Sequence, residues 1–329
     1  MNSELTLAVP TYNRRDAVYE NAKHALYGIK DMSVQYLVVD NNSEDGTYED
    51  LVNAFGENKQ ARFLKNSENI GYFGNFVELF KRCETKYILI SSDEDFFLTE
   101  NIKKLLCFLN EKDPVLVSPQ VLLHGNRLYR GRYKNSVINP KDIRKSANYL
   151  SGLVFNVERS MDAINFLEKN SGNQMVKLYP QVIVACFLAF QDKLYWFGLP
   201  LTKKEYQLDS KIVDSNGLPY ADIGSRITQF QCFDKILSEM ILSEIKVNKK
   251  NNKIVKKLKK ENFYLMLSIL EDSMPVSDSR GFSEIYEIRL QSYIFLKLLN
   301  FLRLSFFGIK PLVKYIAGLK SIRLKGGRL

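Results

Sequence analysis

Strand-like and helix-like segments alternate along the first part of the chain, and this alternation constrains its fold more than any other feature. Residues 5–9 form an apolar run typical of a buried strand, and apolar residues from Val18 to Ile29 then recur at helical spacing. Strands that alternate with helices predict an α/β fold with a mostly parallel sheet. The further strand-like segments are residues 34–39, 61–64, 87–90 and 115–117.

The ends of two predicted helices can be recognised in the sequence. Residues 47–55 precede Gly56, and glycine commonly ends helices. Thr99 is a favourable N-cap for the apolar stripe that begins at Ile102. From Ile227 onward the pattern is almost entirely helical.

The rest of the chain predicts a hairpin and a domain boundary. Residues 120–157 are rich in turn signals, with a hairpin expected at His124-Gly125-Asn126. We predict two parts, an α/β domain of residues 1–222 and a helical, basic C-terminal extension of residues 223–329.

Polar clusters follow three of the predicted strands, at the ends where parallel sheets bind ligands. Asp93 and Asp95 offer the oxygens that a divalent cation and a bound diphosphate require, although an acidic turn before a helix would explain them equally. Asp40 suits a nucleobase or ribose hydroxyl, or a simple turn. Arg14 suits a phosphate group or open solvent. Taken singly, these alternatives stay open.

The order of the motifs is more informative than any one of them. The segments VPTYNR, VVDNNSEDGT, NSENIGYFGNF and ILISSDEDFF begin at Val9, Val38, Asn66 and Ile88. In this order and spacing the sequence resembles the inverting family 2 glycosyltransferases, which have the GT-A fold. The resemblance is specific over residues 1–120 and extends to SGLVF at 151–155, where these enzymes carry a small-residue strand beside the acceptor.

This resemblance implies a nucleotide-sugar donor and a divalent metal, Mn²⁺ or Mg²⁺. Asp95 matches the last acidic position of the family's DxD motif and would bind the metal, while Asp93 would face the ribose and sugar; both are candidate catalytic residues. The acceptor side would include Ser151, Gly152, Tyr179 and Gln181. The residues expected to bind the nucleotide-sugar are Pro10, Thr11, Tyr12, Arg14, Asp40, Asn42, Asn69, Gly71, Asn75 and Asp93.

The general base that direct displacement with inversion requires is not at its usual place. Where the family carries an acidic pair, this chain has Tyr179-Pro180-Gln181, so the base is unassigned. Two rival functions follow. A sugar-phosphate nucleotidyltransferase would need a glycine-rich loop after the first strand, which PTYNRRD does not provide. A GT-A-like scaffold without catalysis would be consistent with the missing base.

The formal net charge of +10 requires a polyanionic partner, and much of the excess lies in residues 246–260 and at the C-terminus. No groove-reading motif or stacking platform accompanies these lysines, so we expect no nucleic-acid partner. The four scattered cysteines and two histidines predict neither disulfides nor structural zinc.

The sequence starts without a signal-peptide pattern, which predicts a cytoplasmic protein. Residues 286–329 interleave apolar and basic residues around Pro311, so a membrane-spanning helix is not expected. Two interpretations stay open for this segment: a peripheral helix on the inner face of an anionic membrane, or a helical pair packed on the domain. The resemblance adds a glycan or lipid-linked glycan acceptor and a setting in O-antigen or capsule polysaccharide synthesis.

Overall fold

The computed structural model describes residues 3–123, 127–129, 134–204, 223–243, 251–260 and 262. The chain divides into two compact units, Met1–Ile269 and Leu270–Leu329, and every described residue belongs to the first. The predicted hairpin turn at 124–126, the boundary at Asp222 and the basic segment 286–329 lie outside the described residues. The division into residues 1–222 and 223–329 therefore stays a prediction.

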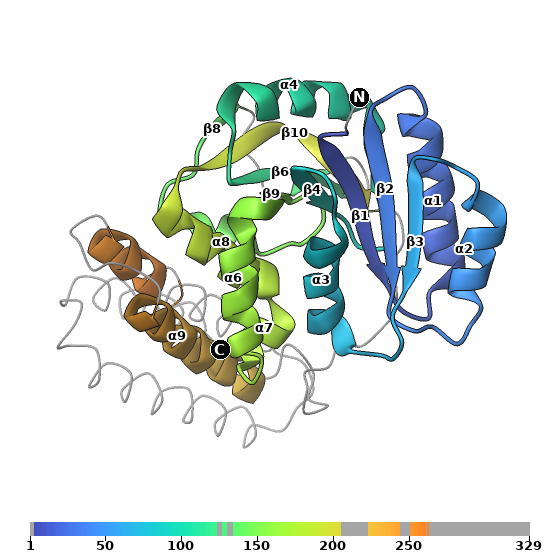
Figure 1. Ribbon diagram of the computed structural model, residues 1–329. Helices are drawn as coiled ribbons and strands as arrows, with labels where there is room; N and C mark the ends of the chain where they lie inside the picture. Colours follow the sequence, from blue (N-terminus) through green and yellow to red (C-terminus); the bar gives the residue numbers. More distant parts are fainter. Residues whose placement is uncertain are drawn as a thin grey trace, which may run out of the picture. The chain divides into compact units, whose positions relative to one another are not determined.

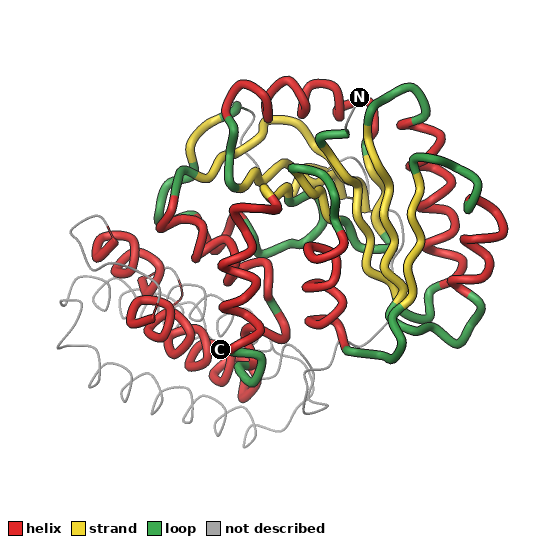
Figure 2. Tube along the Cα trace, in the orientation of Figure 1, coloured by secondary structure: helices red, strands yellow, loops and turns green. Residues whose placement is uncertain are grey.

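A parallel group of four strands forms one half of the central sheet (Figure 1). Buried apolar residues alternate along these strands between the two faces, so that Leu7 and Val9 of β1 belong to one core and Ala8 to the other. Because the strands are parallel, their carboxyl ends lie at one edge, and Figure 2 shows loops gathered beyond the ends of the first three. In spatial order they are β3 (Ala61–Lys65), β2 (Val34–Asp40), β1 (Leu5–Thr11) and β4 (Tyr87–Ile90).

The other half of the sheet is mixed. β9 (Val154–Asn156) runs antiparallel between β4 and β6 (Leu116–Leu123). β10 (Leu194–Lys204) is parallel to β6 and antiparallel to β5 (Asp95–Phe97), which forms the edge of the sheet. The short strands β7 (Arg127–Tyr129) and β8 (Ser136–Val137) pair with β6 and β10.

Helices cover both faces of the sheet (Figure 1). α1 (Arg15–Ile29), α2 (Thr47–Phe55) and α4 (Ile102–Lys112) contribute to one apolar core. The other core includes α8 (Pro180–Gln191), a helix that is apolar almost all round and buried through Phe190. Its other helices are α3 (Gly71–Arg82), α5 (Ile143–Ser146), α6 (Val157–Lys169), α7 (Gln174–Leu178) and α9 (Ile223–Ser243).

The sequence-based elements are largely confirmed in the first part of the chain, with two corrections. Thr99 does not cap α4; it begins a 3-10 turn, Thr99–Asn101, and its side chain packs so tightly on Gly28 that an added Cβ there would lie 2.1 Å from Thr99 Oγ1. Ser151 and Gly152 do not lie in a strand but in the turn before β9, where Gly152 adopts a φ of 91°. In both places a tertiary contact overrides the local preference.

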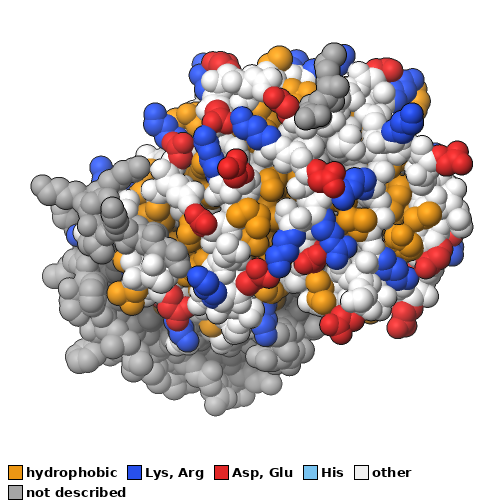
Figure 3. All heavy atoms as spheres, viewed as in Figure 1, with side chains coloured by type: hydrophobic (Ala, Val, Ile, Leu, Met, Phe, Trp, Pro, Cys, Tyr) orange, Lys and Arg blue, Asp and Glu red, His pale blue; other side chains and the backbone are white. Residues whose placement is uncertain are grey.

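Charged side chains of both signs are interspersed over the described surface seen in Figure 3. No helix among the described residues is long and apolar enough to cross a membrane.

Candidate active site

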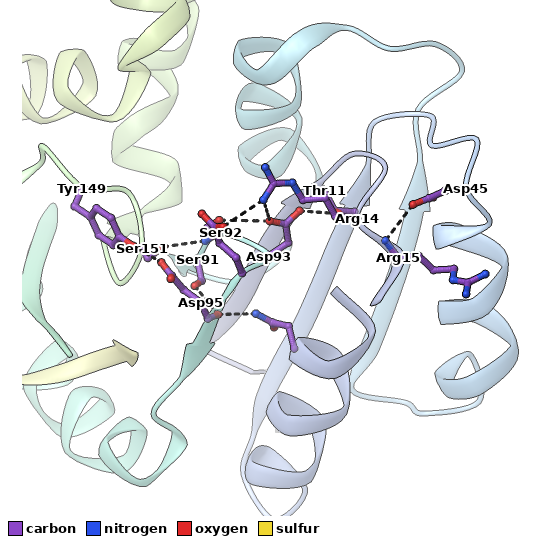
Figure 4. A network of polar contacts seen from close by, with 12 residues as sticks. Thr11, Arg14, Arg15, Asp45, Ser91, Ser92, Asp93, Asp95, Tyr149 and Ser151 are labelled. Carbon is purple, nitrogen blue, oxygen red and sulfur yellow. Dashed lines mark hydrogen bonds and ion pairs between the residues drawn. The ribbon is translucent and has the colours of Figure 1, made fainter. Parts of the chain in front are cut away.

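The carboxyl ends of β1 and β4 bring several polar side chains together (Figure 4). Thr11 Oγ1 at the end of β1 donates a hydrogen bond of 2.9 Å to Asp93 Oδ2. Arg14 Nη1, in the loop after β1, lies 3.6 Å from Asp93 Oδ1 and 3.4 Å from Glu94 Oε2. Residues far apart in the sequence thus hold Asp93 from two directions.

Asp93 is buried, and its ionisation reflects competing effects. Burial raises the pKa of Asp93 to about 6, against the charge of Arg14 and the hydrogen bond from Thr11, which both favour the carboxylate. A buried carboxyl of this kind, beside one cation and one hydroxyl donor, is typical of a functional site.

Asp95 points away from Asp93, toward the loop before β9 (Figure 4). Its carboxylate is fully buried, and Oδ2 accepts a hydrogen bond of 2.7 Å from the Tyr149 hydroxyl. Asn21 Nδ2 of α1 donates to the Asp95 carbonyl at 2.6 Å, so the backbone at the start of β5 is fixed by a helix on one face of the sheet. Asp93 and Asp95 therefore contact different sets of residues.

One of the two carboxylate oxygens of Asp95 accepts no hydrogen bond from a described residue. Oδ1 is buried and has no hydrogen-bond partner within the described part of the chain. Burial raises the pKa of Asp95, while the hydroxyl groups of Ser151 and Tyr149 oppose that rise by favouring the carboxylate. An orphaned buried oxygen costs stability, and a bound cation or ligand would relieve that cost.

The residues around Asp95 fit a hard divalent cation. Mg²⁺ and similar ions are bound by one or two carboxylates together with substrate phosphates, so a single protein carboxylate suffices when a diphosphate is present. The described residues contain no cluster of three or more His, Cys, Asp or Glu side chains that could hold a metal without substrate. A metal at Asp95 Oδ1 would therefore need further ligands from a bound diphosphate.

The end of β2 supplies a second carboxylate, Asp40, which pairs in register with Thr11. Asp40 is fully buried and accepts two hydrogen bonds from Ser43, from its hydroxyl and from its backbone N–H. Burial raises the pKa of Asp40, while the bonds from Ser43 oppose that rise. Asn42 between them has a φ of 63°, so the backbone turns sharply after the strand.

An amide network joins the ends of β1, β2 and β3. Asn41 Nδ2 donates to Asn69 Oδ1 at 2.7 Å, and Asn66 Nδ2 donates to Asn41 Oδ1 and Asn75 Oδ1, both at 3.1 Å. Asn75 Nδ2 donates to the carbonyl of Val39 at 3.0 Å. Gly71, with a φ of 74°, begins α3 and donates its N–H to Asn69 Oδ1. Of the predicted residues, Asn69 thus bonds to Gly71 directly and is linked to Asn75 through Asn41 and Asn66.

Ser151 and Gly152 lie beside the loop after β4. Ser151 Oγ accepts a hydrogen bond of 3.0 Å from the backbone N–H of Ser92, and the Gly152 N–H donates to the carbonyl of Ile90. A Cβ at Gly152 would lie 2.9 Å from Pro119 Cγ, and the left-handed φ also favours glycine there. This turn therefore holds the loop that carries Asp93 and Asp95.

The family model for glycosyl transferase family 2 matches residues 6–161, which span all of these strand ends. Residues 6–161 are a family 2 glycosyl transferase domain.

No curated protein sequence matches the chain. The fold resembles crystal structures of TarS 1–349 from S. aureus: the complex with UDP-GlcNAc aligns with a TM-score of 0.57 at 13% identity, covering 79% of this chain and 73% of that one. The complex with UDP aligns with a TM-score of 0.54 at 12% identity, covering 78% and 70%. The GT-A fold class is confirmed.

The family 2 domain contains every predicted donor-side residue, but two predicted acceptor-side residues lie beyond it. Tyr179 and Gln181 stand at the start of α8, which carries no acidic residue in its first turn. The Gln181 side chain is only 3% exposed, and its Oε1 has no hydrogen-bond partner among the residues that the structure describes. Among the predicted donor-side residues, the Tyr12 side chain is 42% exposed. Pro10 lies within β1, opposite Val39 of β2.

Several residues of the site were not predicted. Tyr149 had no signal of its own, although it precedes the SGLVF segment by two positions. Asn41, Ser43 and Asn66 belong to motifs that were recognised, but the sequence alone does not show that their side chains bond to one another. Among the described residues outside the site, His24 stacks on Phe96 at the surface, and Trp196 and Phe197 are core residues.

Proposed function

We propose that this chain transfers a sugar from a nucleotide-sugar donor to a glycan or lipid-linked glycan acceptor, with inversion and with a divalent metal held by Asp95. The observation that carries the proposal is the orphaned Oδ1 of Asp95 within a family 2 domain, beside the Thr11–Asp93–Arg14 cluster. An open carboxylate oxygen in a buried strand-end loop is what a metal-bound diphosphate needs.

In this proposal, different residues of the protein orient Asp95, face the sugar and hold the metal. Tyr149 holds Oδ2 of Asp95 and so leaves Oδ1 directed to the ligand. Asp93, oriented by Thr11 and Arg14, faces the ribose and sugar. The metal, when bound, supplies positive charge to the departing nucleoside diphosphate.

The nucleoside is proposed to bind at the ends of β1, β2 and β3. Asp40 and the amide network of Asn41, Asn66, Asn69 and Asn75 give this region fixed polar groups. The TarS structures bear on the donor, because they contain UDP and UDP-GlcNAc. UDP-GlcNAc is therefore the first donor to test.

A second candidate function is a scaffold of the same fold that does not catalyse transfer. The observation that favours it is Gln181, a neutral amide buried at the start of α8, where the family's acidic base is expected. Donor turnover separates the two functions, since a scaffold neither transfers nor hydrolyses. The proposed setting in O-antigen or capsule synthesis, and the peripheral membrane contact of residues 286–329, stay predictions.

The proposal is tested first by a thermal-shift screen of nucleotide-sugars with and without Mn²⁺, because a ligand that binds only the folded state raises the melting temperature. The donor that stabilises the chain is then used in a transfer assay with glycan acceptors. Stabilisation that depends on Mn²⁺, followed by transfer, supports the enzyme. Binding without any turnover supports the scaffold, and no stabilisation by any nucleotide-sugar contradicts both.

A further inference from the structure

A lysine at the end of β10 lies opposite Asp95 in the sheet. β5 and β10 are antiparallel, and their register pairs Lys204 with Asp95 and Lys203 with Phe96. Residues directly opposite each other in an antiparallel pair have Cβ atoms about 5 Å apart and project to the same side. The Lys204 side chain therefore starts beside the Asp95 carboxylate although it is far away in the sequence.

The Lys204 side chain is near Asp95 but forms no ion pair with it. The charge of Lys204 is close enough to favour the ionised form of Asp95, yet the Lys204 side chain makes no ion pair or hydrogen bond with another described side chain. It is only partly exposed. An ammonium group held beside a buried carboxylate, but not bound to it, has donors available for a further anion.

A cation on the other side of this loop already has acidic partners. Arg14 lies within ion-pair distance of both Asp93 and Glu94, so its charge is largely spent on acidic residues of the protein. A nucleoside diphosphate carries more negative charge than one divalent ion at Asp95 would balance. A second positive group on the opposite strand would complete the balance, and the compact ammonium of lysine suits phosphate oxygens as a point charge.

We propose that Lys204 contacts the diphosphate of the donor, opposite the Asp95 carboxylate, and so binds the nucleoside diphosphate and stabilises it as it departs. The inference rests on the proposed function, since it names a further residue of the same donor site. Positive groups aimed at charge that develops on a leaving group lower the barrier to transfer.

Lys203 provides a matched control for the experiment. Successive strand residues point to opposite sides, so Lys203 has the same charge and nearly the same position but projects away from Asp95. Isothermal titration is used with UDP and GDP, the tighter of the two for the wild-type chain being the probe, and with the corresponding nucleoside. Each titration is run in EDTA and in Mn²⁺, so that a direct contact with lysine is measured without the metal as well.

Lys204→Met should weaken the nucleoside diphosphate about tenfold to a hundredfold, the usual loss for a charged hydrogen bond, and leave nucleoside affinity unchanged. Lys203→Met should leave both affinities unchanged. Lys204→Arg, which keeps the charge, should recover part of the loss and guards against a folding defect of the methionine variant. Equal diphosphate affinity in wild type and Lys204→Met, or equal losses in Lys203→Met, would overturn this inference alone. A wild-type chain that binds neither diphosphate and is stabilised by no nucleotide-sugar would overturn the proposed function and the inference with it.

Discussion

Two regions at the same edge of the sheet satisfy their polar groups in opposite ways. At the ends of β1, β2 and β3, Asp40 is closed by Ser43 and the asparagine side chains bond mainly to one another. In the loop after β4, Asp93 is held by groups from β1, whereas Asp95 keeps one buried oxygen without a partner in the described chain. Both carboxylate oxygens of Asp40 in the first region are hydrogen-bonded within the protein, whereas one carboxylate oxygen of the second region is not.

This difference suggests that the two regions have different roles: the first provides a rigid binding surface and the second provides a charged group. A closed network of amides fixes the backbone and presents a rigid surface, which suits recognition of a nucleobase and ribose. An open buried carboxylate is unfavourable until a cation or ligand arrives, which suits a group that acts on the diphosphate. Substitutions in the two regions should therefore fail in different ways.

The largest expected effect is on transfer in Asp95→Asn. The amide keeps the shape but removes the charge, so the transfer rate should fall about a hundredfold to a thousandfold, the range seen when one group that stabilises a transition state is lost. The melting temperature should not fall, because a buried charge with one open oxygen is being removed.

Steady-state transfer and thermal denaturation are measured for this variant beside Asp16→Asn. The Asp16 side chain is 94% exposed at the start of α1, and its variant should behave as wild type. Transfer by Asp95→Asn at the wild-type rate would remove Asp95 from the catalytic residues.

The next effect is on nucleoside binding in Asp40→Ala. Loss of a buried charged acceptor costs about 1.5–3 kcal/mol, so nucleoside and nucleoside diphosphate should both bind about tenfold to a hundredfold more weakly. The equal loss for both ligands distinguishes Asp40 from Asp95, whose variant should lose affinity only for the diphosphate.

Calorimetry measures these affinities, with Ser43→Ala as the companion variant that opens the turn but keeps the carboxylate. Nucleoside affinity that is unchanged in Asp40→Ala would show that this residue does not bind the base. A loss just as large in Ser43→Ala would assign the effect to the shape of the turn.

In the closed region, Asn75→Ala should destabilise the fold. The substitution removes the hydrogen bonds that Asn75 makes with the Asn66 amide and the Val39 carbonyl, and losing a buried partner of this kind costs about 1–3 kcal/mol. Urea denaturation measures the free energy of unfolding. Asn53→Ala on the exposed side of α2 should change it by less than about 0.5 kcal/mol, and an equally small change in Asn75→Ala would mean that the network is not structural.

The smallest effect is expected for Tyr149→Phe, which removes the hydroxyl that orients Asp95 Oδ2. Loss of about 1.4 kcal/mol of positioning would lower the transfer rate about tenfold. Tyr27→Phe, at a side chain that is 75% exposed, should leave the rate unchanged. If Tyr149→Phe also transfers at the wild-type rate, Asp95 is oriented by other groups.

The comparison also explains what the sequence could and could not predict. Although the local acidic pattern alone would have fitted a turn equally, Asp93 and Asp95 were predicted because they follow a strand-like segment and belong to the last of four motifs whose order resembles the family. Asn41 and Asn66 were not, because asparagines after strands are equally typical of turns, and only the pairing of β1, β2 and β3 brings their amides together.

Contacts between distant segments account for the remaining differences. Tyr149 reaches Asp95 across 54 positions, and Lys204 does so through the register of two antiparallel strands, neither of which leaves a periodic signal. Thr99 looked like a helix cap, but its packing against Gly28 of α1 decides its conformation. The alternation of strands and helices was predictable because the apolar periodicity that distinguishes a strand from a helix lies within each local segment of the sequence.

The metal dependence of nucleotide binding tests the proposed role of Asp95 most directly. UDP and GDP are titrated into the wild-type chain and into Asp95→Asn, in Mn²⁺ and in EDTA. We expect Mn²⁺ to tighten binding of the preferred diphosphate by about tenfold or more in the wild type, since a cation then bridges two anionic groups, and to give no such gain in Asp95→Asn. Equal affinities with and without Mn²⁺ in the wild type, or the same gain in both proteins, would contradict a metal site at Asp95.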